Sequence, residues 1–115
     1  MIAVIFEVEP ATGRREDYLA TAATLRTNLE GSDGFISVER FQSLTNPGKM
    51  LSLSFFRDEQ AVKAWRNTVA HRSAQAAGRS GMFKDYRLRI ASVIRDYGLN
   101  DRQHAPDDSP LAHPQ

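Results

Sequence analysis

Two side chains in the segment 64–83, Trp65 and His71, have the types that can do chemistry on a small molecule. His71 is the one histidine outside the C-terminal segment 98–115, and imidazole has an ordinary pKa close to neutral pH. His71 is therefore the candidate general acid or base, a role that requires a substrate proton about 3 Å away. The alternative is a boundary histidine that hydrogen-bonds to a neighbouring strand or to water.

Trp65 is the one tryptophan of the chain, and its spacing from neighbouring valines places it on the apolar face of a helix. It either fills the core or lines a pocket, and its ring can do both, with the indole N–H directed at a ligand. His71 follows six residues later, which on a continuous helix is a rotation of about 120°. The two side chains are therefore expected on different faces. His71 then belongs to a polar stripe with Ala64, Thr68 and Gln75.

The elements that must position these residues follow from the hydrophobic period. Alternation of period two marks strands, and a spacing of three and four marks helices. Turns rich in Gly, Asn and Pro separate them. The pattern predicts strands over 2–9, 35–43, 50–56 and 82–96, and helices over 14–30 and 59–77. This β-α-β-β-α-β order is the α+β, ferredoxin-like fold, a four-stranded antiparallel sheet with two helices on one face.

The second face of this sheet is expected to lack cover. Apolar side chains would be exposed there, depending on the register, from among Ile5, Phe35, Phe41, Leu53 and Phe55. An apolar patch of this kind on a small protein implies a partner, most commonly a second copy related by a two-fold axis. A homodimer with the two sheets face to face is therefore predicted.

Composition narrows the function classes. The 115 residues are expected to form one domain over 1–97, with an extended tail over 98–115 that holds three of the five prolines. A net charge of +1 gives no field for nucleic acid or membrane, and no apolar run approaches the ~20 residues of a membrane span. The absence of cysteine excludes thiolate chemistry, and His104 and His113 lack further ligands at metal-binding spacing. A cytoplasmic protein without a metal is expected.

Basic side chains on the last predicted strand need partners. Tyr86 and Leu88 alternate with Arg87 and Arg89 along it. An arginine is not buried without acids or an anionic ligand. Ion pairs are favoured over anion binding, with Glu7, Glu39 or Asp96 as the acids.

Three motifs carry a resemblance to a known family. They are DGF at 33–35, F-x-D-x-x-A-x-x-x-W at 56–65 and H-x-x-A-Q-x-x-G-R at 71–79. Over residues 1–97 the chain resembles the antibiotic biosynthesis monooxygenase superfamily of small dimeric α+β barrels. These motifs specify a fold better than an activity, because the superfamily includes several activities.

The resemblance implies a reaction without a cofactor. The cofactor-free oxygenases of the family deprotonate phenols to an anion that reacts directly with oxygen. Trp65 matches the family tryptophan, and Tyr86 and Arg89 are candidates for its anion-stabilising tyrosine and arginine. The prediction is a cofactor-independent monooxygenase of a small aromatic or phenolic compound, with His71, Trp65, Tyr86 and Arg89 as the catalytic set.

Two other functions remain open at this point. A non-enzymatic dimeric module that binds a small molecule would have an interior packed with side chains and no connected pocket. The heme-degrading branch of the family has an asparagine where this chain has Phe6 or Glu7, and a histidine where it has Gln75. Gln is a poor iron ligand, so a heme site would need His71 in a shifted register.

Overall fold

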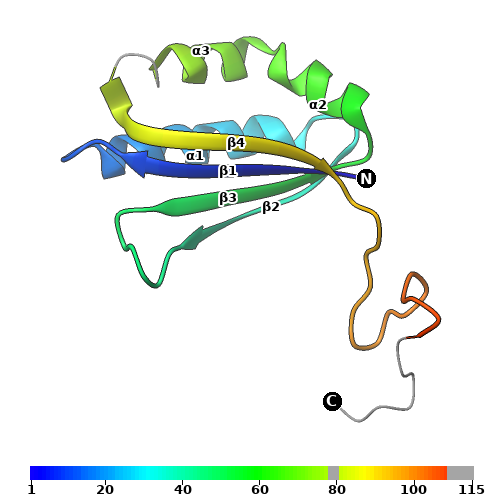
Figure 1. The fold of residues 1–115 in the computed structure, drawn as a ribbon. Coiled ribbons are helices and arrows are strands. Elements are labelled where there is room, and N and C mark those ends of the chain that lie inside the picture. The colour runs from blue at the N-terminus through cyan, green and yellow to red at the C-terminus, as the bar shows by residue number, and fades with distance from the viewer. Residues whose placement is uncertain (78–80, 109–115) are drawn as a thin grey trace.

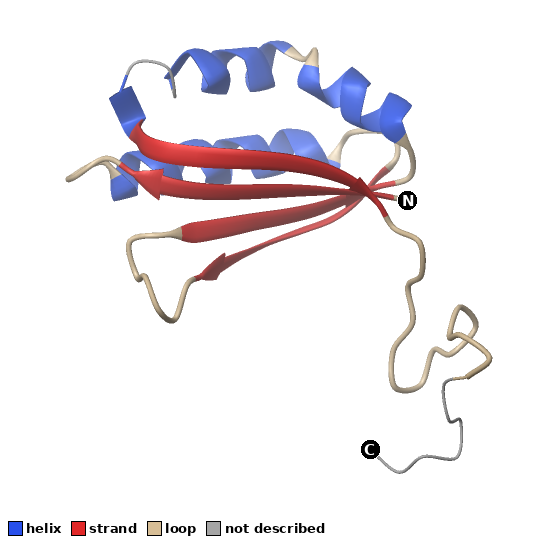
Figure 2. Cartoon of the chain, in the orientation of Figure 1, coloured by secondary structure: helices blue, strands red, loops and turns tan. Residues whose placement is uncertain are grey.

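The computed structural model describes residues 1–77 and 81–108, which form one antiparallel sheet with three helices (Figures 1 and 2). The strand order in the sheet is β2-β3-β1-β4, and the helices lie together on one face of it. The elements are β1 (Ile2–Pro10), α1 (Arg15–Glu30), β2 (Phe35–Gln42), β3 (Met50–Phe56), α2 (Glu59–Arg66), α3 (Val69–Ala77) and β4 (Phe83–Ser92). The predicted ferredoxin-like fold is confirmed, except that two helices stand where one was expected.

The core lies between the sheet and the helices, in two clusters. One surrounds the fully buried Phe56 and includes residues of β1, α1 and α2. The other joins Val8 of β1 to Tyr18 and Ala22 of α1 and to two buried methionines. Alternation along β1 explains this arrangement, because its even-numbered side chains all face the helices. Among the described residues, no helix has the length and apolarity needed to cross a membrane.

Strand β4 is shorter than the predicted 82–96. Its partner β1 begins at Ile2, which lies opposite Ser92. One further bond, from the Val93 N–H to the Met1 carbonyl at 3.0 Å, follows this pair. From Val93 to Asp108 the chain has no helix or strand and leaves the sheet (Figure 1). The last part of the predicted tail, including His113, lies outside the described residues.

Strand β2 begins with a β-bulge that the alternation did not predict. The register shifts between Phe35 and Ser37, so Phe35 pairs with Phe56 and packs on it with ring centroids 5.8 Å apart. Ile36 is left exposed in its place. Phe35 therefore belongs to the core beside the helices, and its expected position on the open face is wrong.

The predicted continuous helix over 59–77 is also wrong, because it breaks at Asn67 and Thr68. Asp58 caps the start of α2, where its carboxylate accepts the Ala61 N–H at 2.9 Å. Asn67 ends α2, and the Thr68 hydroxyl accepts the His71 N–H at 3.2 Å to begin α3. Asn and Thr side chains compete with helical hydrogen bonds in this way, and so they favour helix ends.

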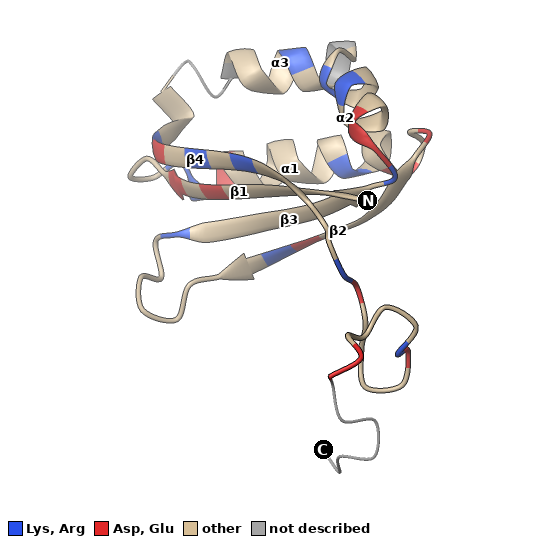
Figure 3. Ribbon diagram, turned by 45° about the vertical axis from the view of Figure 1, so that its right-hand side comes forward, with Lys and Arg blue, Asp and Glu red and all other residues tan. Residues whose placement is uncertain are grey.

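The open sheet face combines apolar side chains with an ion-paired rim. Ile5, Leu53 and Phe55 alternate with residues that face the helices, and all three are half-buried. On the same face Glu7 pairs with Lys49 at 3.1 Å and with Arg89. Acidic and basic residues thus adjoin each other where β1 and β4 run side by side (Figure 3). The expected ion pair of Arg89 with Glu7 is confirmed.

Candidate functional site

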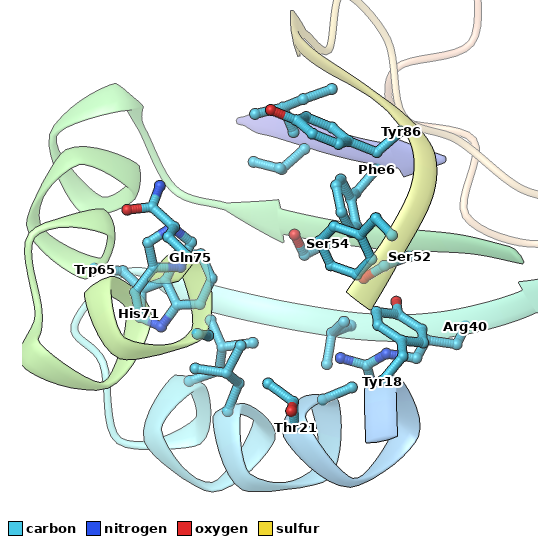
Figure 4. A pocket seen from close by; sticks show the side chains of 18 of the residues that line it. Phe6, Tyr18, Thr21, Arg40, Ser52, Ser54, Trp65, His71, Gln75 and Tyr86 are labelled. Atoms are coloured by element: carbon cyan, nitrogen blue, oxygen red, sulfur yellow. The ribbon is translucent and has the colours of Figure 1, made fainter. Parts of the chain in front are cut away.

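A cavity of about 500 Å³ lies between the helix-facing side of the sheet and all three helices. This volume is within the range of small-molecule sites. Members of both core clusters line it, so it occupies the middle of the helix–sheet interface. Its wall is mostly apolar, and the polar residues in it are Thr21, Arg40, Ser52, Ser54, His71, Gln75, Lys84, Asp85 and the phenols of Tyr18 and Tyr86 (Figure 4).

The β4 wall of the cavity is open to solvent. Tyr86, Leu88 and Ile90 share the helix-facing side of β4, yet they are 59%, 47% and 44% exposed. The reason is that α3 packs chiefly on α1 and α2 rather than on β4. A packed interior, expected for a non-enzymatic module, is therefore not what the described residues form.

Trp65 and His71 meet inside this cavity. Their ring centroids are 4.2 Å apart with an interplanar angle of 61°, an edge-to-face contact. The expectation that they lie on separate faces is wrong because it assumed an unbroken helix. The break at Asn67 and Thr68 redirects α3 and brings His71 against the indole (Figure 4).

His71 is half-buried in the cavity wall. Burial first, and the positive charge of Arg66 second, lower the pKa of the imidazole below its ordinary value. The ring is therefore neutral at pH 7, with a lone pair free on one nitrogen. Its Nδ1 is buried and has no hydrogen-bond partner among the described residues, as is also true of Trp65 Nε1. Since buried polar atoms are nearly always partnered, two such atoms on touching rings indicate a ligand position.

Arg40 supplies a third unpartnered polar atom. It projects from β2 into the cavity, where its Nε is buried without a partner in the part of the chain that the structure describes. Its guanidinium lies beside Tyr18, whose pKa burial raises and Arg40 partly lowers again. The sequence analysis did not select Arg40 as a site residue. The signal was present, because Arg40 alternates in phase with Val38, on the side of the strand that faces the helices.

Of the predicted catalytic set, the structure brings three members together. Tyr86 lines the cavity with Trp65 and His71, and its ring packs on Phe6 at 5.7 Å between centroids. Arg89 lies on the opposite face of the sheet, paired with Glu7. It therefore does not line the cavity.

Of the positions relevant to heme, Gln75 and Phe6 lie in the same cavity, whereas Glu7 lies on the open face of the sheet. Gln75 lines the cavity one helical turn beyond His71, and Phe6 lines the sheet side. Within residues 1–77 and 81–108, no three His, Cys, Asp or Glu side chains gather so as to hold a metal ion. No observation at these positions adds to the case for an iron ligand.

This arrangement defines a class of protein, a small α+β domain with a ligand-sized cavity under its helices. The profile of the antibiotic biosynthesis monooxygenase family matches residues 1–77, and the chain belongs to that family. The jasmonate monooxygenase ABM of Pyricularia oryzae is 45% identical over 101 residues, covering 88% of this chain and 47% of that protein. The chain thus spans about half the length of that relative.

Solved structures agree on the fold. Rv0793 from Mycobacterium tuberculosis aligns with a TM-score of 0.76 at 16% identity, covering 84% of this chain and 98% of that one. A Deinococcus radiodurans protein assigned to the antibiotic biosynthesis monooxygenases aligns with a TM-score of 0.77 at 11% identity, covering 85% and 97%. At these identities the likeness is one of fold alone, and the site must be argued from its own residues.

Proposed function

We propose that the chain is a cofactor-independent monooxygenase of a small aromatic or phenolic compound. The observation that carries the proposal is the neutral His71, with an unpartnered Nδ1, in contact with Trp65 in an apolar cavity. The family assignment and the name of the Pyricularia oryzae relative support oxygenase chemistry. His71 is the general base, and Trp65 and Tyr86 line the cavity around the substrate.

The proposed reaction needs no external reductant. His71 takes a proton from a substrate hydroxyl, and the resulting anion adds oxygen at carbon. The protonated His71 then returns its proton to the peroxide, which gives a hydroperoxide. The hydroperoxide then loses water and leaves a carbonyl. One oxygen atom enters the substrate and the other leaves as water. The substrate supplies the two hydrogens of this water and the two electrons that an external reductant would otherwise provide. The Trp65 N–H can donate to the negative oxygen as charge develops, which is how preorganised donors accelerate such steps.

Oxygen uptake is the direct test of this function. Purified protein mixed with a panel of phenols, and with jasmonate as the compound named in the relative, is expected to consume oxygen with at least one of them. Uptake should be unchanged by a chelator and should need no flavin or nicotinamide. Arg26→Gln, a change on the outer face of α1, is the control and should behave as the wild type. A requirement for an added cofactor, or no uptake with the entire panel, would contradict the proposal.

A homodimer through the open sheet face is the second part of the proposal. Ile5, Leu53 and Phe55 form an apolar strip there, and antiparallel sheets commonly keep such a face against a partner. The rim formed by Glu7, with Lys49 and Arg89, would surround this strip.

A charge in the middle of this face should separate the subunits. Leu53→Arg is expected to convert the dimer to a monomer at micromolar concentration, because an unpaired buried charge costs several kcal/mol. Sedimentation velocity measures the change. Leu44→Arg is the matched control, since Leu44 is 99% exposed in the loop between β2 and β3. A dimer that survives Leu53→Arg would place the interface elsewhere.

A further inference from the structure

Arg40 differs from the other cations of the cavity wall. Lys84 is 72% exposed and pairs with Glu9 at 3.8 Å. Arg40 is half-buried, and no acid forms an ion pair with it among the residues that the structure describes. A guanidinium taken out of water without a counter-charge is costly. The position thus holds a positive charge with which no carboxylate is paired in the part of the chain that the structure describes.

The neighbours of Arg40 do not neutralise it. Tyr18 lies beside it, and burial raises the pKa of this phenol, so that it stays uncharged at neutral pH. Among the described residues of the cavity wall, the acid is Asp85, whose carboxylate accepts the Tyr86 N–H at 2.9 Å and whose side chain is exposed. Ser52, opposite Arg40 in the β2–β3 register, offers a hydroxyl. The guanidinium of Arg40 and the hydroxyls of Tyr18 and Ser52 are donors suited to an anion.

Arg40 and His71 occupy different ends of the cavity. Arg40 and Tyr18 lie together on one side, and Trp65, His71 and Gln75 lie on the other (Figure 4). Mostly apolar side chains line the space between the two ends. A ligand that contacts both ends is therefore an apolar body with one anionic group.

From this geometry we propose that Arg40 binds the carboxylate of the substrate, so that the cavity selects small apolar acids and presents their other end to His71. The planar guanidinium fits a carboxylate with two parallel hydrogen bonds, one of them from the free Nε. A single arginine in an apolar wall suits one carboxylate better than a phosphate, which carries more charge. The inference rests on the proposed function where it gives His71 a role at the other end of the ligand. The contact between Arg40 and the carboxylate concerns binding alone.

Binding of a matched pair of probes tests this role without any turnover. Naphthylacetate and naphthylacetamide have nearly the same shape and differ in charge. Calorimetry is expected to show that the wild type binds the acid about 10- to 100-fold more tightly, the range of a charge-assisted hydrogen-bond pair. Arg40→Gln should remove this preference and leave the affinity for the amide within about twofold. Arg40→Lys, which keeps the charge without the planar fork, should retain part of it.

Lys84→Gln is the control, because it removes the other cation of the wall and should keep the preference for the acid. Thermal unfolding of each variant confirms that the fold is intact. No binding of the acid by the wild type, equal binding of acid and amide, or a preference that survives Arg40→Gln would overturn the proposal. If the protein prefers the acid but consumes no oxygen, the oxygenase function is contradicted and the role of Arg40 in binding is supported. If the protein consumes oxygen but binds acid and amide equally, the oxygenase function is supported and the role of Arg40 is contradicted.

Discussion

Replacing His71 with Gln is expected to lower kcat/KM for oxygen consumption by about 100- to 10,000-fold, the usual worth of a general base. Gln keeps a polar side chain of similar size against Trp65 but cannot take up a proton at neutral pH. The loss should fall on kcat, since the rest of the cavity still binds the substrate. His104→Gln, the same change in the tail, is the matched control. A variant of His71 with undiminished turnover would contradict the role.

The pH dependence of kcat/KM is a second test of this prediction. It would not follow the pKa of His71 if the residue had a purely structural role. Only the neutral imidazole can accept a proton, so kcat/KM should rise with pH through the pKa of His71 and then level off. Because burial and Arg66 lower this pKa, the midpoint of the increase in kcat/KM should lie at a pH below 6.5, the ordinary pKa of histidine. Arg66→Gln removes the smaller of the two causes, and the rise should therefore move to higher pH. Arg26→Gln should leave the profile unchanged.

The fold was predictable because its strands and first helix have strong local patterns. The even-numbered residues of β1 face the helices as alternation requires, and Tyr18, Ala22 and Leu29 are buried at helical spacing on α1. The contact of Trp65 with His71 was not predictable from the same patterns. It depends on whether two residues, Asn67 and Thr68, end one helix and begin another. Capping energies of about 1 kcal/mol decide that outcome, and a periodicity count does not weigh them.

The cavity and Arg40 show a different limit of sequence reasoning. Alternation places Arg40 on the side of β2 that faces the helices, but a long side chain can also extend from such a position to solvent. Whether it is held inside depends on the space left between the sheet and the helices, where Tyr18 of α1 lies beside it. That space is set by how α3 packs on α1 and α2, which no local pattern encodes. The site is therefore a property of the tertiary packing.

The DGF motif has a structural role in this chain, and each of its residues contacts the segment from the end of β3 to the first turn of α2. Asp33 pairs with Arg57 at 3.2 Å, and Phe35 packs on Phe56. Gly34 has a φ of +82° and lies so close to α2 that a Cβ added to it would be 2.6 Å from the Ala61 Cβ. The motif thus positions the helix that bears Trp65. It explains the family resemblance without specifying a reaction.

Replacing Gly34 with Ala should therefore lower the free energy of unfolding by about 3 kcal/mol, a large part of the stability of a small domain. Two effects destabilise the variant. The positive φ costs ~1 kcal/mol, and the overlap of the added Cβ with α2 accounts for the remainder. Gly13→Ala separates them, because Gly13 has a φ of +78° with no atom within 4 Å of an added Cβ. It should cost about 1 kcal/mol. Denaturant unfolding measures both changes.

A double-mutant cycle assigns the larger cost to the contact itself. Ala61→Gly alone should destabilise the protein by about 1 kcal/mol, since it removes a helix-favouring residue. In the Gly34→Ala background the same change also removes the overlapping methyl group. It should then cost nothing or restore stability, with a coupling energy of about 1–2 kcal/mol. Additive effects would mean that the added Cβ does not press on Ala61, and in that case Gly34 would not hold α2 and its Trp65 in position.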